Sequence, residues 1–137
     1  MLRNSVDHQR GSDTSLLVVG PPAESSLALL TACGFSATPC VDARDALRML
    51  NRGRHEAVLC DLEMPGIGGM ELLNLVCADF PDVALVVVTR PGKLRHGMLA
   101  MIAGASGYIQ KPLQPEIVAA SLQCALRKKR LESAIRA

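Results

Sequence analysis

The chain has 137 residues, of which 49% are hydrophobic, 20% charged and only 2% aromatic, and its formal net charge is +2. This length fits a single domain with a packed core, and the small net charge gives no reason to expect a polyanionic partner. The scarcity of aromatic side chains argues against nucleic-acid surfaces that rely on base stacking, so we expect no direct binding of nucleic acid.

Targeting signals and cysteine usage indicate a cytoplasmic protein. Residues 1–15 lack the apolar core of a secretory signal, and the longest aliphatic run, residues 83–88, is far too short to span a bilayer. The five cysteines form no CxxC pair and lie in apolar stretches, which favours buried free thiols in a reducing compartment. We therefore expect a cytoplasmic protein that has no membrane partner.

The first half of the chain predicts a flexible leader followed by two strand–helix units. Residues 1–14 are polar and aperiodic, whereas residues 16–19 form an aliphatic run that stops abruptly at Gly20 and two prolines. Each predicted helix here ends before a glycine, Gly34 or Gly53, a residue type that is common just beyond a helix. The expected elements, in order, are a strand at 16–19, a helix at 23–33, a strand at 35–40 and a helix at 42–51.

The second half of the chain repeats this alternation. Its aliphatic runs are short and continuous, and Pro115 opens a last helix that we expect to run beyond Arg130. Continuous aliphatic strands between amphipathic helices predict a doubly wound, flavodoxin-like α/β fold: a five-stranded parallel sheet with helices on both faces. The expected elements are a strand at 57–60, a helix at 68–78, a strand at 83–88, a helix at 93–103, a strand at 106–109 and the helix from 115.

Polar side chains follow the last three predicted strands directly. Asp61 follows the third strand, Thr89 the fourth and Lys111 the fifth. The carboxyl ends of parallel strands meet at one edge of the sheet, so a carboxylate, a hydroxyl and an ammonium group should converge there. Any one of them alone is most simply a turn residue, but their joint placement is far more specific.

Three segments, in this order, resemble the receiver domains of bacterial two-component response regulators. They are residues 57–69 around Asp61, residues 86–89 ending at Thr89, and residues 104–112, which end in a Lys-Pro pair that is typically cis in that family. The resemblance covers about residues 15–128.

The resemblance implies a role for each of several residues. Asp61 would be the phosphoacceptor, taking a phosphoryl group from the phosphohistidine of a sensor kinase or phosphotransfer protein. Lys111 would pair with the phosphoryl oxygens, and Thr89 would turn in to bond one of them. Tyr108 would be the switch aromatic that moves inward and repacks the output face. Glu63 would offer its backbone carbonyl to a metal held by Asp61.

The chain departs from the family beside two of these residues. Receivers normally end the first strand with two adjacent acids that hold Mg²⁺, and this chain has Gly20 and Pro21 there, with Glu24 as the nearest acid. One carboxylate and one carbonyl are too few ligands for an ion that needs near-octahedral coordination by oxygen. We therefore expect Mg²⁺ binding to be weak or absent. After Thr89 the family usually has a small residue, whereas Arg90 here either points to solvent or modifies the pocket.

The last predicted helix extends beyond the part that the resemblance covers. Residues 129–137 should form a C-terminal helical extension, in which Leu131 and Ile135 make an apolar pair on an otherwise polar helix. We expect this end to join a downstream effector domain or protein, or a second copy of the chain in a homodimer. The surface used would be the face made by the fourth and fifth predicted helices.

Two functions remain open, and a third class is disfavoured. The first is a phosphorylatable receiver in a signalling relay. The alternative is a pseudo-receiver that acts as a phosphorylation-independent protein-interaction module, which Gly20, Pro21 and Arg90 favour. A small flavodoxin-like enzyme or nucleotide binder is disfavoured, because no glycine-rich phosphate loop follows the first strand and no nucleophile–base pair is evident. We therefore do not expect an enzyme.

Overall fold

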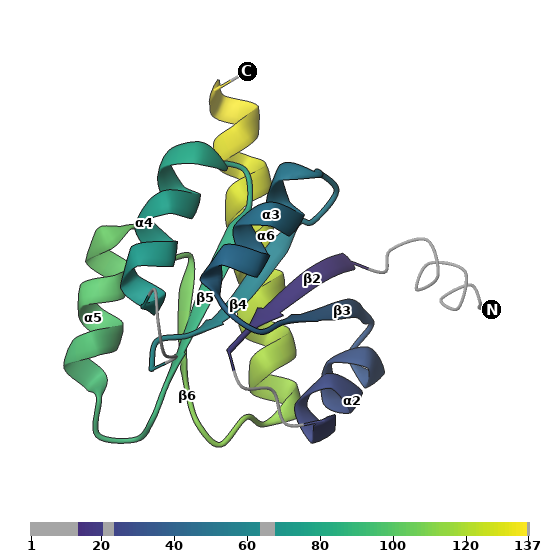
Figure 1. The fold of residues 1–137 in the computed structure, drawn as a ribbon, viewed down its shortest axis with the longest axis vertical. Helices are drawn as coiled ribbons and strands as arrows, with labels where there is room; N and C mark the ends of the chain where they lie inside the picture. The colour runs from purple at the N-terminus through teal and green to yellow at the C-terminus, as the bar shows by residue number, and fades with distance from the viewer. Residues whose placement is uncertain (1–13, 21–23, 64–67, 137) are drawn as a thin grey trace.

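The computed structural model describes residues 14–20, 24–63 and 68–136, apart from the side chains of residues 24–26. Within this part of the chain, five parallel strands form one sheet in the order β3-β2-β4-β5-β6, as Figure 1 shows. The expected leader, except for Thr14, and Pro21 lie outside the described residues. The strands are β2 (Thr14–Val19), β3 (Phe35–Cys40), β4 (Ala57–Asp61), β5 (Ala84–Thr89) and β6 (Gly107–Gln110).

Helices alternate with the strands and cover both faces of the sheet (Figure 1). The doubly wound α/β fold that the sequence predicts is therefore confirmed, with element boundaries that differ from the expected ones by a residue or two. The helices are α2 (Glu24–Ala32), α3 (Ala43–Asn51), α4 (Gly69–Asp79), α5 (Leu94–Ala103) and α6 (Pro115–Arg136).

Two hydrophobic cores form because alternate residues of each strand face opposite sides of the sheet. Leu17 and Val19 pack in the core beneath α3, α4 and α5, whereas Leu16 and Val18 pack in the core beneath α2 and α6. Every side chain of β5 is buried. Burial from both sides explains why the sequence shows continuous aliphatic runs instead of an alternation of apolar and polar residues.

Helix boundaries follow local signals in the sequence. Asp42 caps α3, because its carboxylate Oδ1 accepts a hydrogen bond from the backbone N–H of Asp45 at 2.9 Å. Gly104 ends α5 in the left-handed conformation, with φ of 118°, which a residue with a Cβ rarely adopts. Asp42 thus marks the start of a helix that follows the carboxyl end of β3, and Gly104 marks the turn that leads into β6.

The last helix, α6, runs without a break to Arg136, and its end rises beyond the sheet in Figure 1. Its last turns are nevertheless attached to the domain. The Ser133 hydroxyl donates to Oδ1 of Asp82 at 2.6 Å, and the guanidinium group of Arg136 pairs with the same carboxylate. None of the helices described here is both long enough and apolar enough to cross a membrane.

Candidate functional site

The sheet brings the three predicted polar side chains to one edge. Asp61 ends β4 and Thr89 ends β5, while Lys111 follows β6. Backbone hydrogen bonds fix these strand ends together, from Leu62 N–H to Val88 O at 3.0 Å and from Lys111 N–H to Thr89 O at 2.8 Å. The peptide bond between Lys111 and Pro112 is cis. The expected convergence of a carboxylate, a hydroxyl and an ammonium group is thus what the structure contains.

Both oxygens of the Asp61 carboxylate have a hydrogen-bond partner. Oδ2 lies 2.7 Å from Nζ of Lys111, and Oδ1 accepts a hydrogen bond from the backbone N–H of Glu63 at 2.9 Å. The Asp61 side chain is only 12% exposed, whereas that of Lys111 is 40% exposed. A charge-assisted pair at this distance fixes the carboxylate in one orientation, with a cation beside Oδ2.

Gly20, at the end of β2, packs directly against Asp61. Its backbone has φ of 118°, and a Cβ built on it would lie only 2.8 Å from Cβ of Asp61. The backbone N–H of Gly20 donates to Cys40 O at 3.2 Å, which holds the residue in this place. A side chain at this position would therefore be strained and would collide with the Asp61 side chain.

The described residues do not fit Mg²⁺. Within this part of the chain no three His, Cys, Asp or Glu side chains lie close enough together to hold a metal ion. The Asp61 carboxylate is already bound by Lys111 and Glu63, and Mg²⁺ needs several oxygen ligands in near-octahedral geometry. Glu24 begins α2, but its side chain lies outside the described part. Weak or absent Mg²⁺ binding stays a prediction.

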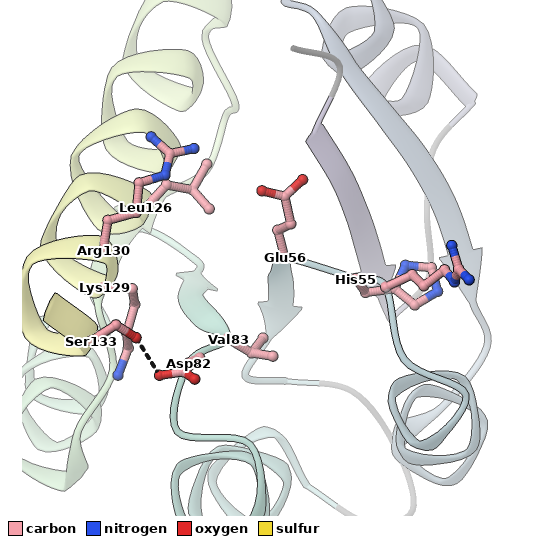
Figure 2. Close-up of a pocket in the computed structure, with 9 residues that line it drawn as sticks. His55, Glu56, Asp82, Val83, Leu126, Lys129, Arg130 and Ser133 are labelled. Carbon is pink, nitrogen blue, oxygen red and sulfur yellow. Dashed lines mark hydrogen bonds between the residues drawn. The ribbon is translucent and has the colours of Figure 1, made fainter. Parts of the chain in front are cut away.

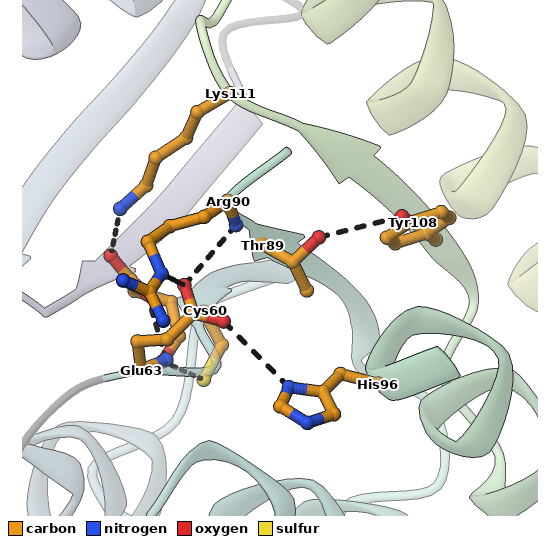
Figure 3. A network of polar contacts seen from close by, with 8 residues as sticks. Cys60, Glu63, Thr89, Arg90, His96, Tyr108 and Lys111 are labelled. Carbon is orange, nitrogen blue, oxygen red and sulfur yellow. Dashed lines mark hydrogen bonds and ion pairs between the residues drawn. The ribbon is translucent and has the colours of Figure 1, made fainter. Parts of the chain in front are cut away.

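Thr89 and Tyr108 lie side by side on neighbouring strands. The Thr89 hydroxyl is fully buried and donates to the Tyr108 hydroxyl at 3.4 Å, a long and therefore weak hydrogen bond. In Figure 3 the Thr89 hydroxyl points toward Tyr108 and away from Lys111. Thr89 is thus poised next to the pocket without bonding to the Asp61–Lys111 pair.

Arg90 contacts the side chain of Glu63 at the rim of the pocket. Its backbone N–H donates to Oε1 of Glu63 at 3.2 Å, its Nε lies 3.9 Å from the same oxygen, and its side chain is 59% exposed. Nδ1 of His96 lies 4.0 Å from Oε2 of Glu63. This oxygen atom is buried and has no hydrogen-bond partner among the described residues. Arg90 is therefore a rim residue that faces Glu63, and not a second cation on Asp61.

The contact of the Glu63 side chain with Arg90 was not predicted from the sequence, because the family resemblance assigns a role only to the backbone carbonyl of Glu63. The signal that could have found it is an acid two residues after one strand end and a base one residue after the neighbouring strand end. The Cys60 thiol precedes Asp61 and is not a nucleophile. Burial, and then the charge of Asp61, raise the pKa of the Cys60 thiol to about 12, so it stays protonated.

A second pocket lies beyond the amino ends of β4 and β5, at the other end of these strands from Asp61 (Figure 2). It measures about 450 Å³ and is lined partly by α6. Of its two acids, Glu56 and Asp82, the carboxylate of Asp82 is bound by Ser133 and Arg136. The pocket contains none of the three converging residues, so we assign the chemistry of the domain to the Asp61 edge.

Comparison with known proteins gives matches over most of the chain. The family model of the response regulator receiver domain matches residues 24–123, and so begins just beyond Gly20 and Pro21. The luminescence regulatory protein LuxO of Vibrio campbellii is 29% identical over 99 residues, which make up 72% of this chain and 22% of LuxO. The transcriptional regulatory protein QseB of Haemophilus influenzae is 29% identical over 100 residues, 73% of this chain and 45% of QseB. The chain thus spans less than half the length of either relative.

Solved structures agree with the fold. A response regulator receiver domain protein from Clostridium thermocellum superimposes with a TM-score of 0.79 at 24% identity, covering 86% of this chain and 98% of that one. NtrX from Brucella abortus superimposes with a TM-score of 0.82 at 22% identity, covering 90% of this chain and 29% of NtrX. At these identities the likeness establishes the fold alone.

Proposed function

The chain belongs to the family of response regulator receiver domains, and we propose that it receives a phosphoryl group on Asp61 from a sensor histidine kinase or a phosphotransfer protein. The family resemblance read from the sequence is thereby confirmed: this is a receiver domain of the kind found in two-component response regulators. We further propose that it acts in the cytoplasm as a signalling module and not as an enzyme.

The observation that carries this proposal is the 2.7 Å contact between Lys111 and Asp61, with Thr89 at the next strand end. In the proposed reaction an Asp61 carboxylate oxygen forms a bond to phosphorus while the N–P bond of a phosphohistidine breaks, and the imidazole nitrogen leaves with the electron pair. Lys111 supplies a positive charge for the phosphoryl oxygens. Thr89 would have to give up its contact with Tyr108 to bond one of them.

The charge balance of the pocket supports transfer that depends little on Mg²⁺. The pair of Asp61 and Lys111 sums to zero without a metal, and Arg90 faces Glu63 at the rim. Only Lys111 is then in place to neutralise the charge that develops on the phosphoryl group. We propose that Asp61 is labelled slowly, and that added Mg²⁺ changes the rate little.

A second function is favoured by the position of Gly20. Its backbone fills the place where the family carries metal-binding acids, and it leaves no room for a side chain beside Asp61. A receiver that has lost metal-assisted transfer could act through its surface alone, as a phosphorylation-independent interaction module. The two functions differ in whether Asp61 ever carries a phosphoryl group.

Intact mass spectrometry separates these two functions. The chain is treated with acetyl phosphate and, separately, with phosphoramidate, each with and without Mg²⁺, beside Asp61→Asn as the matched control. We expect the mass of one phosphoryl group to appear slowly in the wild type at similar rates with and without Mg²⁺, and not in Asp61→Asn. Rapid labelling only in Mg²⁺ would contradict the metal-poor pocket, and no labelling by either donor would favour the interaction module.

The partner surface that we propose is the face of α5 and α6, the fourth and fifth helices of the sequence analysis. Both helices carry large exposed apolar side chains: Leu94 and Ile102 on α5, and Ile117, Leu131 and Ile135 on α6. Leu94 and Ile117 line the same hollow, and a contiguous exposed apolar patch marks an interaction surface. We propose that a second copy of the chain docks on this face in a homodimer, with a downstream effector domain as the alternative occupant.

A further inference from the structure

The ring of Tyr108 occupies the space where a side chain of residue 97 would be. A Cβ built on Gly97 would lie 2.2 Å from Cε1 of Tyr108, 2.4 Å from its Cδ1 and 2.5 Å from its Cζ. Real Cβ atoms do not approach other atoms so closely, and three ring atoms are involved at once. We call this contact surface on the backbone of Gly97 the Gly97 seat.

Helix formation does not explain a glycine at this position. Gly97 is a buried residue inside α5, where alanine is the better helix former because glycine loses more conformational freedom on folding. Its φ is not in the left-handed region, so the backbone does not require glycine either. Because Gly97 has no side chain, it leaves the room that the Tyr108 ring occupies.

The seated ring contacts Thr89 at its far end. Tyr108 lies on β6 beside Val87 of β5, two residues before Thr89, and its hydroxyl accepts the hydrogen bond from Thr89 at 3.4 Å. Figure 3 shows the Thr89 hydroxyl directed at Tyr108 and away from Lys111. The position of the ring on α5 therefore sets the position of the hydroxyl group that the pocket would use.

We infer that Gly97 is a positioning residue for the switch: its seat holds the Tyr108 ring against α5, and through that ring it holds the Thr89 hydroxyl away from Asp61. This inference deepens the proposed function, because it rests on Thr89 and Tyr108 as the switch pair of that site. A phosphoryl group on Asp61 then has to compete with Tyr108 for the Thr89 hydroxyl.

The chain carries its own reporter for this contact. Tyr108 is the only tyrosine and there is no tryptophan, so the intrinsic tyrosine fluorescence comes from the seated ring alone. The experiment measures quenching of this fluorescence by acrylamide in the unphosphorylated protein. It compares the wild type with Gly97→Ala, with Gly68→Ala as the matched control, because a Cβ on Gly68 meets nothing within 4 Å. Thr89→Val removes the hydrogen bond and keeps the shape of the side chain.

We expect Gly97→Ala to raise the quenching constant severalfold, because the ring has to leave the seat. Gly68→Ala and Thr89→Val should leave the quenching constant close to the wild-type value, since neither removes the seat. The seat would be overturned if Gly97→Ala left the ring as shielded as in the wild type, or if Thr89→Val exposed it as much as Gly97→Ala did.

A double variant keeps the inference testable if Gly97→Ala unfolds the chain. Removing the ring makes room for the new methyl group, so Gly97→Ala/Tyr108→Ala should regain the far-ultraviolet circular dichroism of the folded protein. A double variant that is also unfolded would contradict the seat. These measurements need no phosphoryl group, so their outcome is separate from that of the Asp61 labelling experiment.

Discussion

The two parts of the candidate site have different relations to the family pattern. At the carboxyl ends of β4, β5 and β6 the acceptor, the hydroxyl and the lysine are all present, and Lys111 contacts Asp61 directly. At the carboxyl end of β2 the backbone of Gly20 closes against Asp61. The difference teaches that the carboxylate, hydroxyl and ammonium groups of the last three strands can be brought together while the neighbouring strand end leaves no room for a side chain beside Asp61.

Substitution of Lys111 should have the largest effect, and it should act on the rate at which Asp61 is labelled. Lys111→Met removes the cation that contacts Asp61, the only one among the described residues, and we expect the rate of Asp61 labelling by phosphoramidate to fall about 100-fold, as when a preorganised charge donor is lost. Lys128→Met, an exposed lysine on α6, is the matched control and should label at the wild-type rate. Equal rates in the wild type and Lys111→Met would remove Lys111 from the transfer chemistry.

Gly20 tests the other part of the site. Gly20→Ala adds a methyl group that collides with Asp61 as well as placing a Cβ on a left-handed backbone, whereas Gly92→Ala, with φ of 86° and open space around it, has only the backbone cost. We expect Gly20→Ala to lower the free energy of unfolding in urea by about 2 kcal/mol more than Gly92→Ala does. Equal losses in the two variants would mean that Gly20 does not press on Asp61.

The same geometry bears on any attempt to restore the metal site by substitution. Gly20→Asp would place its carboxylate on a backbone that disfavours side chains and against the Cβ of Asp61. An acid at this position therefore needs a rebuilt loop after β2. A substitution of Gly20 alone should destabilise the domain and not create a Mg²⁺ site.

Local and periodic signals explain how much could be predicted from the sequence. The aliphatic runs predicted all five strands of the described sheet, and strand ends alone predicted that Asp61, Thr89 and Lys111 would converge. The Gly97 seat and the closure of Gly20 on Asp61 could not be predicted, because each depends on how closely a glycine backbone approaches one side chain, and residue order and periodicity do not give that distance. The contact between Arg90 and Glu63 was missed although both residues lie just after neighbouring strand ends.

Substitutions that test self-association should have a smaller effect on the free energy than those at Lys111 and Gly20, because they remove exposed apolar contacts. If a second copy docks on the face of α5 and α6, Leu131→Ser/Ile135→Ser should weaken the dimer about 10-fold, measured by light scattering across a concentration series. Val41→Ser is the matched control, because Val41 is 76% exposed but lies in the turn before α3. A wild-type chain that stays monomeric at the highest concentration would leave the effector domain as the occupant of this face.

The smallest effect should come from the contact that attaches the end of α6. The hydrogen bond from Ser133, and then the charge of Arg136, lower the pKa of the exposed Asp82 carboxyl below its usual value of 3.8. A lowered folded-state pKa means that the charged form of Asp82 stabilises the folded chain above pH 3.8, and that this stabilisation is lost as the pH falls through the folded pKa. Ser133→Ala should therefore lower the melting temperature slightly at neutral pH, and its difference from the wild type should shrink in acid. Ser36→Ala, at an exposed serine on β3, should show no such pH dependence. A Ser133→Ala difference that stays constant from neutral pH down to well below 3.8 would show that Asp82 does not hold the helix end through its charge.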